Sequence, residues 1–108
     1  MKKEPGPGVE EKSNGGGFHT FRLYITGASP NSSRAVTNLK VFFEKYLKSR
    51  YKLQIIDIYQ QPQVAESVNI IALPLLIRNS PLPERRLIGD MSNEEKIYQS
   101  LGLANLGI

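Results

Sequence analysis

The stretch from residue 20 to residue 58 constrains the fold of this chain more than any other part of its sequence. Apolar and polar residues alternate over Thr20–Thr26, which predicts a strand with one buried face. Apolar residues then recur at helical spacing over Ser33–Lys48, and the β-branched run Tyr51–Ile58 predicts a second strand. Together they predict a βαβ unit, whose two strands should be parallel and joined by a right-handed crossover.

The turn before the predicted helix has the sequence Gly-Ala-Ser-Pro over residues 27–30. Gly27 and Pro30 are typical of turn geometry rather than of ligand contacts. Either Ser32 or Ser33 can cap the helix, because a serine hydroxyl accepts a hydrogen bond from a free amide of the first turn.

Local sequence specifies the second half of the chain more weakly. Pro62 can start a short helix over Val64–Val68. The apolar run Ile70–Ile77, interrupted by Pro74, fits either a strand or a buried helix, since periodicity does not decide for short runs. A short strand is expected at Arg85–Ile88.

The C-terminal part begins with a turn at Gly89 and Asp90. Ser92-Asn-Glu-Glu95 then fits a capping box, in which the Ser92 hydroxyl accepts from the Glu95 amide. We therefore expect a helix from Asn93 to about Leu101, with Ile97 facing the core.

The resulting order, βαβαββα, is that of the thioredoxin-like α/β fold, with Pro74 where such folds carry a cis proline. Thioredoxin-like enzymes place their redox cysteines at the first strand-to-helix turn, but this sequence has no cysteine. Dithiol chemistry is therefore excluded, and Ser29 has no base beside it in sequence to make it a nucleophile. A binding protein is favoured over an enzyme, and no cofactor is expected.

Length and composition predict one domain over residues 18–108, preceded by a disordered N-terminal extension over residues 1–17. The extension holds five of the nine glycines and few apolar residues. No apolar run approaches the roughly 18 residues that span a bilayer, and the N-terminus lacks the apolar stretch of a signal peptide. We expect a cytoplasmic protein with no membrane contact.

The formal net charge is +4, and the basic residues are scattered along the sequence. Nucleic-acid-binding proteins tend to cluster basic residues or interleave them with aromatic ones, so nucleic acid is not an expected partner. A modest positive field suits an acidic protein partner. The single histidine, His19, excludes a histidine-rich metal site and is expected to be a bystander.

Several blocks of the sequence resemble the circadian-clock KaiB family. They occur in the family's order and spacing over roughly residues 20–103, and they are residues 23–36, 53–58, 61–66, the region of Pro74, and residues 86–96. The family usually has threonine before the strand proline, where this chain has Leu73.

The resemblance implies a metamorphic, non-catalytic regulatory protein. One state would be the thioredoxin-like monomer, and the other a ground state, βαββααβ, that forms homodimers and homotetramers. The two states would share the first half of the chain and rebuild the second. Such an exchange requires the two packings to differ by only a few kcal/mol.

The resemblance also implies a KaiC-like hexameric ATPase as partner, with a KaiA-like protein as a second one in cyanobacteria. Leu73, together with a sequence that ends at Ile108 without the acidic tail common in clock members, favours the first partner over the second. A role in stress-response or light-linked signalling fits as well as a role in a clock. The alternative is the sensor domain of a KaiB-like histidine kinase, which would be thioredoxin-like in every condition.

Five residues are the candidates for function. Arg34, near the start of the predicted helix, is expected to contact an acidic partner surface; the alternative is a solvated charge. Tyr24 is expected to stack at an interface; the alternative is a half-buried strand tyrosine. Gly89 and Asp90 are candidates for the switch hinge because glycine reaches positive φ freely and Asp90 can cap locally. Pro74 completes the proposed hinge.

Overall fold

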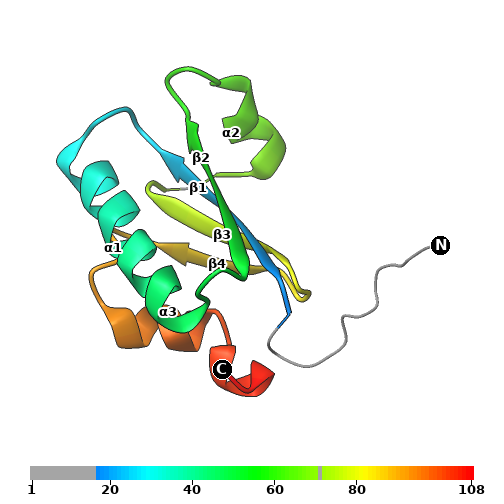
Figure 1. Cartoon of the computed structure of the whole chain (residues 1–108). Coiled ribbons are helices and arrows are strands. Elements are labelled where there is room, and N and C mark those ends of the chain that lie inside the picture. Colours follow the sequence, from blue (N-terminus) through cyan, green and yellow to red (C-terminus); the bar gives the residue numbers. More distant parts are fainter. Residues whose placement is uncertain (1–16, 71) are drawn as a thin grey trace.

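A four-stranded sheet lies between helices on its two faces in the computed structural model, which describes residues 17–70 and 72–108 (Figure 1). The predicted extension over residues 1–17 lies, apart from Gly17, outside the described residues. The elements in chain order are β1 (His19–Ile25), α1 (Pro30–Tyr46), β2 (Tyr51–Asp57), α2 (Gln63–Val68), β3 (Leu75–Ser80), β4 (Arg85–Ile88), α3 (Glu94–Ser100) and the 3-10 turn η2 (Leu103–Leu106).

The strand order across the sheet is β2-β1-β3-β4. β1 and β2 are parallel and joined through α1, as the βαβ pattern predicted, whereas β3 runs antiparallel to both β1 and β4. The observed βαβαββα order confirms the thioredoxin-like arrangement; η2 was not predicted.

The larger core lies between the sheet and the pair of helices α1 and α3. It is built on aromatic contacts: the Phe21 and Phe43 rings are 4.3 Å apart between centroids, and the Phe43 and Tyr51 rings 5.0 Å. Ile97 of α3 faces this core, as predicted, and Leu101 at the C-cap of the same helix is buried in it too. The buried residues are Phe21, Leu23, Ala35, Leu39, Phe42, Phe43, Leu47, Leu76, Leu87, Met91, Ile97, Leu101 and Leu103.

A smaller core lies on the opposite face, beneath α2. Its buried members are Tyr24, Ile56, Leu75 and Ile77. Figure 1 shows α2 at one end of the sheet, next to the point where β2 ends, so this short helix covers only part of the face.

The helix caps are the main correction to the sequence-based picture. α1 begins at Pro30 and is capped by Ser29, whose hydroxyl accepts from the Ser32 amide at 3.3 Å. We expected Ser32 or Ser33 as the cap. Proline fits the first helical position because its φ is already helical and its missing amide is not needed there, so the helix starts earlier.

α3 shows a similar shift of one residue. Its cap is Asn93, whose side-chain oxygen accepts from the Lys96 amide at 3.0 Å, rather than Ser92. The Ser92 amide instead donates to Oδ1 of Asp90 at 3.1 Å. That local turn keeps Ser92 outside the helix and leaves the cap to Asn93, which serves equally well.

The apolar run around Pro74 forms a strand only from Leu75 onward. The Leu73–Pro74 peptide bond is cis, as predicted for the thioredoxin-like state, and two further cis bonds precede Pro81 and Pro83. The short elements α2 and β4 match their predicted positions.

Asp57, at the end of β2, ties the βαβ unit together. Its Oδ1 accepts from the Gly27 amide and from the Tyr59 amide, both at 2.9 Å. These two hydrogen bonds fix the turn between β1 and α1 against the end of β2.

Replacing Asp57 by alanine should therefore lower the free energy of unfolding by about 1–3 kcal/mol, because the part-buried Gly27 amide and the exposed Tyr59 amide both lose their acceptor. Urea unfolding followed by circular dichroism measures this. The matched control is Glu66→Ala on the exposed side of α2, which should change stability by less than about 0.5 kcal/mol. Equal losses in the two variants would contradict the anchoring role.

Candidate partner-binding site

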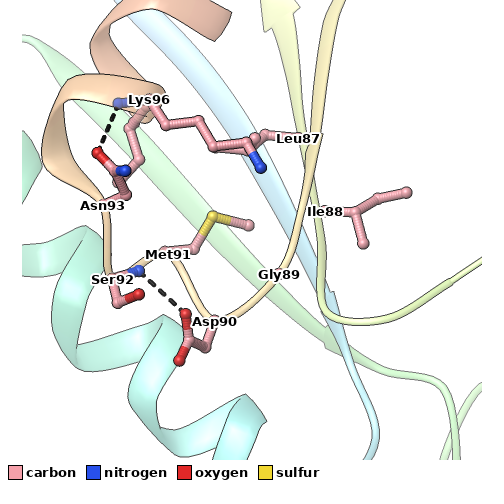
Figure 2. Close-up of a pocket in the computed structure, with 9 residues that line it drawn as sticks. Leu87, Ile88, Gly89, Asp90, Met91, Ser92, Asn93 and Lys96 are labelled. Carbon is pink, nitrogen blue, oxygen red and sulfur yellow. Dashed lines mark hydrogen bonds between the residues drawn. The ribbon is translucent and has the colours of Figure 1, made fainter.

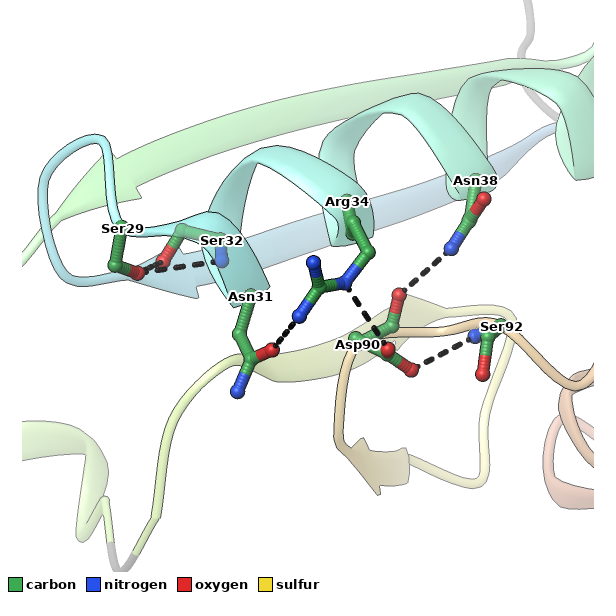
Figure 3. A network of polar contacts seen from close by, with 7 residues as sticks. All are labelled: Ser29, Asn31, Ser32, Arg34, Asn38, Asp90 and Ser92. Atoms are coloured by element: carbon green, nitrogen blue, oxygen red, sulfur yellow. Dashed lines mark hydrogen bonds and ion pairs between the residues drawn. The ribbon is translucent and has the colours of Figure 1, made fainter.

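The first turns of α1 lie beside the loop between β4 and α3, as Figure 3 shows. The Arg34 guanidinium Nε lies 3.4 Å from Oδ2 of Asp90. Arg34 also donates to the side-chain oxygen of Asn31 one turn earlier on the helix. The structure thus brings together two residues that the sequence singled out on separate grounds.

Asn38 holds the same loop through its backbone. Its side-chain amide donates to the Asp90 carbonyl oxygen at 2.9 Å (Figure 3). Asn38 was missed in the sequence, although a signal was present: Asn38 follows Arg34 by four residues, and residues at that spacing share one helix face. The polar pair therefore marks the face of α1 that contacts the loop.

The electrostatics of the loop favour an ionised Asp90. The hydrogen bonds from Ser92 and, to a smaller extent, the Arg34 guanidinium hold the pKa of the Asp90 carboxyl below its ordinary value of 3.8, with partial desolvation opposing them. Asp90 is thus a fixed negative charge beside the cation of Arg34. Much of the Arg34 side chain, 55%, is still exposed, so its outer surface is accessible to a partner.

The suspected hinge residues contact one another directly. The Gly89 amide donates to the Pro74 carbonyl oxygen at 3.0 Å, which links the loop to the start of β3. Gly89 has φ of 129°, a conformation that side chains disfavour. The loop lines a small pocket of about 110 Å³. Figure 2 shows the side chains around it, among them Met91 and Lys96.

Tyr24 does not belong to this surface. Its side chain is 1% exposed and packs in the smaller core beneath α2, so in this packing its ring cannot stack on a partner. The alternative stated for Tyr24, a strand tyrosine that is at least half buried, describes this packing better.

At the first strand-to-helix turn, where thioredoxin-like enzymes carry their redox cysteines, the serines of this chain cap the helix. The Ser29 hydroxyl donates to Oγ of Ser32 at 2.8 Å while it accepts from the Ser32 amide (Figure 3). Ser32 is buried and in turn accepts from the Thr26 amide. These hydroxyls form a structural network at the start of α1.

His19 is a buried residue of the sheet. It is 1% exposed, and its ring stacks on Phe21 at 6.1 Å between centroids.

Over residues 17–70 and 72–108, no group of three histidine, aspartate or glutamate side chains could hold a metal ion. Within the same ranges, no helix is both long and apolar enough to cross a membrane.

The model of the KaiB domain matches residues 22–103. The chain belongs to the KaiB family. It is 44% identical over 85 residues to the circadian clock oscillator protein KaiB of Prochlorococcus marinus subsp. pastoris, with 79% of each chain covered. The circadian clock protein KaiB3 of Synechocystis sp. is 42% identical over 88 residues, covering 82% of this chain and 86% of the relative.

Solved structures support the fold of this KaiB-family chain. The N-terminal domain of SasA from Synechococcus elongatus superposes with a TM-score of 0.65 at 20% identity, covering 90% of this chain and 94% of that domain. Chloroplastic thioredoxin z superposes with a TM-score of 0.66 at 15% identity, covering 83% and 79%. At these identities the similarity establishes the thioredoxin-like fold alone.

Replacing Gly89 by alanine should destabilise the described packing by about 1–3 kcal/mol, because a Cβ is disfavoured at this φ even though the space around it is open. The midpoint of urea unfolding measures the loss. Lys40→Ala on the exposed face of α1 is the control and should leave the midpoint nearly unchanged. A neutral Gly89→Ala variant would show that the loop relaxes without cost.

The lowered pKa of Asp90 predicts a pH-dependent contribution to stability. A carboxyl whose folded pKa is depressed stabilises the fold above its unfolded pKa, and this contribution is lost as the pH falls through the folded pKa. The Asp90→Asn variant should therefore be less stable than the wild type near neutral pH, and its stability should decline less steeply below about pH 4. Urea midpoints measured across this range test the prediction, with Glu95→Gln as the exposed control; parallel curves for the wild type and Asp90→Asn would refute it.

Proposed function

We propose that this protein is a non-catalytic regulatory binding protein that docks on a KaiC-like hexameric ATPase in circadian or stress-response signalling. The observation that carries the proposal is the family match over residues 22–103. The exposed guanidinium of Arg34, fixed in place by Asn31 and Asp90, supports a docking surface at the start of α1. An orientated cation of this kind complements an acidic patch on a partner.

Fold exchange is part of the proposal. The second half of the chain would repack from the described βαβαββα order to βαββααβ, and the repacked chain would form homodimers or homotetramers. The contacts of Gly89 and Pro74 support a hinge there, because they connect the loop before α3 to the start of β3. A KaiA-like protein ranks behind the ATPase as a partner.

The second candidate is the sensor domain of a KaiB-like histidine kinase. The described thioredoxin-like packing supports it, since such a domain would hold this fold in every condition. Analytical ultracentrifugation over a wide concentration range separates the two candidates. A dimer or tetramer that dissociates on dilution favours the fold-exchanging protein, and one chain at every concentration favours the sensor domain.

The charge-reversed variant Arg34→Glu should bind a purified KaiC homologue about tenfold more weakly. The attraction between the Arg34 cation and an acidic patch at the rim of the interface becomes a repulsion between like charges. The measurement is a titration after long incubation, which allows a slow exchange of folds to reach equilibrium. Lys40→Glu changes the net charge of α1 by the same amount at a position pointing to solvent, and it should bind as the wild type does.

Arg34→Gln separates the lost attraction from the added repulsion, because it removes the positive charge without introducing a negative one. It should bind with intermediate affinity, and since an exposed ion pair such as Arg34–Asp90 contributes little to stability, it should unfold nearly like the wild type. No binding by the wild type to several KaiC homologues would overturn the proposed function. Equal weakening by Arg34→Glu and Lys40→Glu would show that Arg34 makes no specific contact with the ATPase. It would not contradict the docking on the ATPase itself.

A further inference from the structure

The sheet face that carries α2 is left open at its other end. α2 packs beside Tyr24 and Ile56, near the ends of β1 and β2 (Figure 1). At the opposite end of the same strands the surface is hollowed into an open pocket of about 220 Å³. Its lining residues are Thr20, Phe21, Arg22, Lys52, Gln54 and Asn79.

Strand pairing gathers the basic residues of this open end. In the parallel register of β1 and β2, Thr20 lies opposite Lys52 and Arg22 lies opposite Gln54. Because side chains two residues apart share a face, Arg22 and Lys52 are diagonal neighbours across the two strands. Two cations thus stand side by side although they are distant in sequence.

The pattern continues across the sheet. Arg22 is paired with Ile77 of β3, which is paired in turn with Arg86 of β4. Ile77 is only 1% exposed, although α2 lies toward the other end of the sheet. The two arginines on either side of Ile77 are exposed, as expected where aliphatic stems cover an apolar residue and the charged heads reach water.

The cations of the pocket are not neutralised by their surroundings. Its lining contains two cations, a hydroxyl and two carboxamides, but no carboxylate. Within residues 17–70 and 72–108, neither Arg22 nor Lys52 forms an ion pair, whereas Arg86 lies 3.6 Å from Glu84. Such a surface attracts carboxylates and offers hydrogen-bond donors to orient them.

We propose that this open half of the sheet, formed by Thr20, Arg22, Lys52, Gln54 and Asn79, docks an acidic segment of a partner protein. Carboxylates of that segment lie between the Arg22 guanidinium and the Lys52 ammonium. The surface is on the face of the sheet opposite α1 and Arg34, so it is separate from the docking surface in the proposed function. The inference depends on the described packing and not on the identity of the ATPase.

The chemistry of the face distinguishes a protein segment from other occupants. Binding of single-stranded nucleic acid relies on exposed aromatic rings on which bases stack, and the aromatic side chains of β1, Phe21 and Tyr24, are both buried. A second copy of this chain, related by two-fold symmetry, would place Arg22 and Lys52 against their own like charges. An acidic, extended protein segment meets neither obstacle.

The test is a titration of the full-length, isotope-labelled protein with a short polyglutamate peptide. The amide chemical shifts of the protein are followed by NMR. The expected result is a set of chemical-shift changes centred on the amides of Arg22, Lys52, Gln54 and Asn79, which weaken as salt is added. A polyglutamine peptide of the same length should cause none. Absent shifts, or shifts spread equally over Lys40 and Lys48, would overturn the proposal.

Charge reversal supplies the matched comparison. The Arg22→Glu/Lys52→Glu variant should bind the peptide at least about tenfold more weakly, whereas Lys40→Glu/Lys48→Glu, with the same net charge, should bind like the wild type. If the reversed variant fails to fold, Arg22→Gln/Lys52→Gln tests the same loss of charge without repulsion. Equal weakening by both double variants would refute a specific surface.

A titration with oligothymidylate tests whether the surface binds a protein segment rather than single-stranded nucleic acid. Tighter binding of the oligonucleotide than of polyglutamate at the same residues would overturn it in favour of nucleic acid. Failure of the protein to bind any KaiC homologue would leave these peptide results unchanged. The inference and the proposed function therefore succeed or fail separately.

Discussion

The antiparallel pairing of β3 with β1 is the interaction on which the second half of the structure depends. The βαβ unit formed by β1, α1 and β2 has its own aromatic contacts and its own anchor at Asp57. Everything later in the chain joins the sheet through β3, because β4 is the edge strand beside it. Leu76 and Leu87 then supply the surface on which α3 packs. Releasing this pairing would free the second half while leaving the first intact, which is the division that the proposed fold exchange requires.

The second half also contains a costly polar contact. Arg78 of β3 is 1% exposed, and its guanidinium donates to the Leu101 carbonyl at 2.6 Å and to the Pro83 carbonyl at 3.0 Å. Its cross-strand neighbour is Arg85, and burial together with this second cation lowers the pKa of Arg78. The side chain ties the end of α3 to the turn between β3 and β4, yet it brings a buried charge beside a like one. Such a linkage holds the packing in place without making it deeply stable.

Sequence reasoning recovered the element types and their order because periodicity is a local property, and it failed where two local signals competed. Ser29, Ser32 and Ser33 are all good caps, and only the preference of Pro30 for the first helical position decides among them. Asn93 rather than Ser92 caps α3, because the hydrogen bond from the Ser92 amide to Asp90 holds Ser92 in a turn before the helix. The site was predictable only in part: Arg34 and Asp90 each carried a signal, but their 3.4 Å contact depends on how α3 and its loop pack against α1.

The distribution of charge also could not be predicted from local sequence alone. The basic residues are scattered in sequence, and scattered charge ordinarily forms a solvated surface. Pairing β1 with β2 in parallel nevertheless places Arg22 and Lys52 on one face, because both are at even-numbered positions of strands whose register pairs even with even. Arg34, in contrast, is partly neutralised by Asp90 on the other side of the sheet. The general expectation of an acidic partner thus becomes two proposed surfaces. At Arg34 the chain supplies a counter-charge through Asp90, and at Arg22 and Lys52 the described residues supply none.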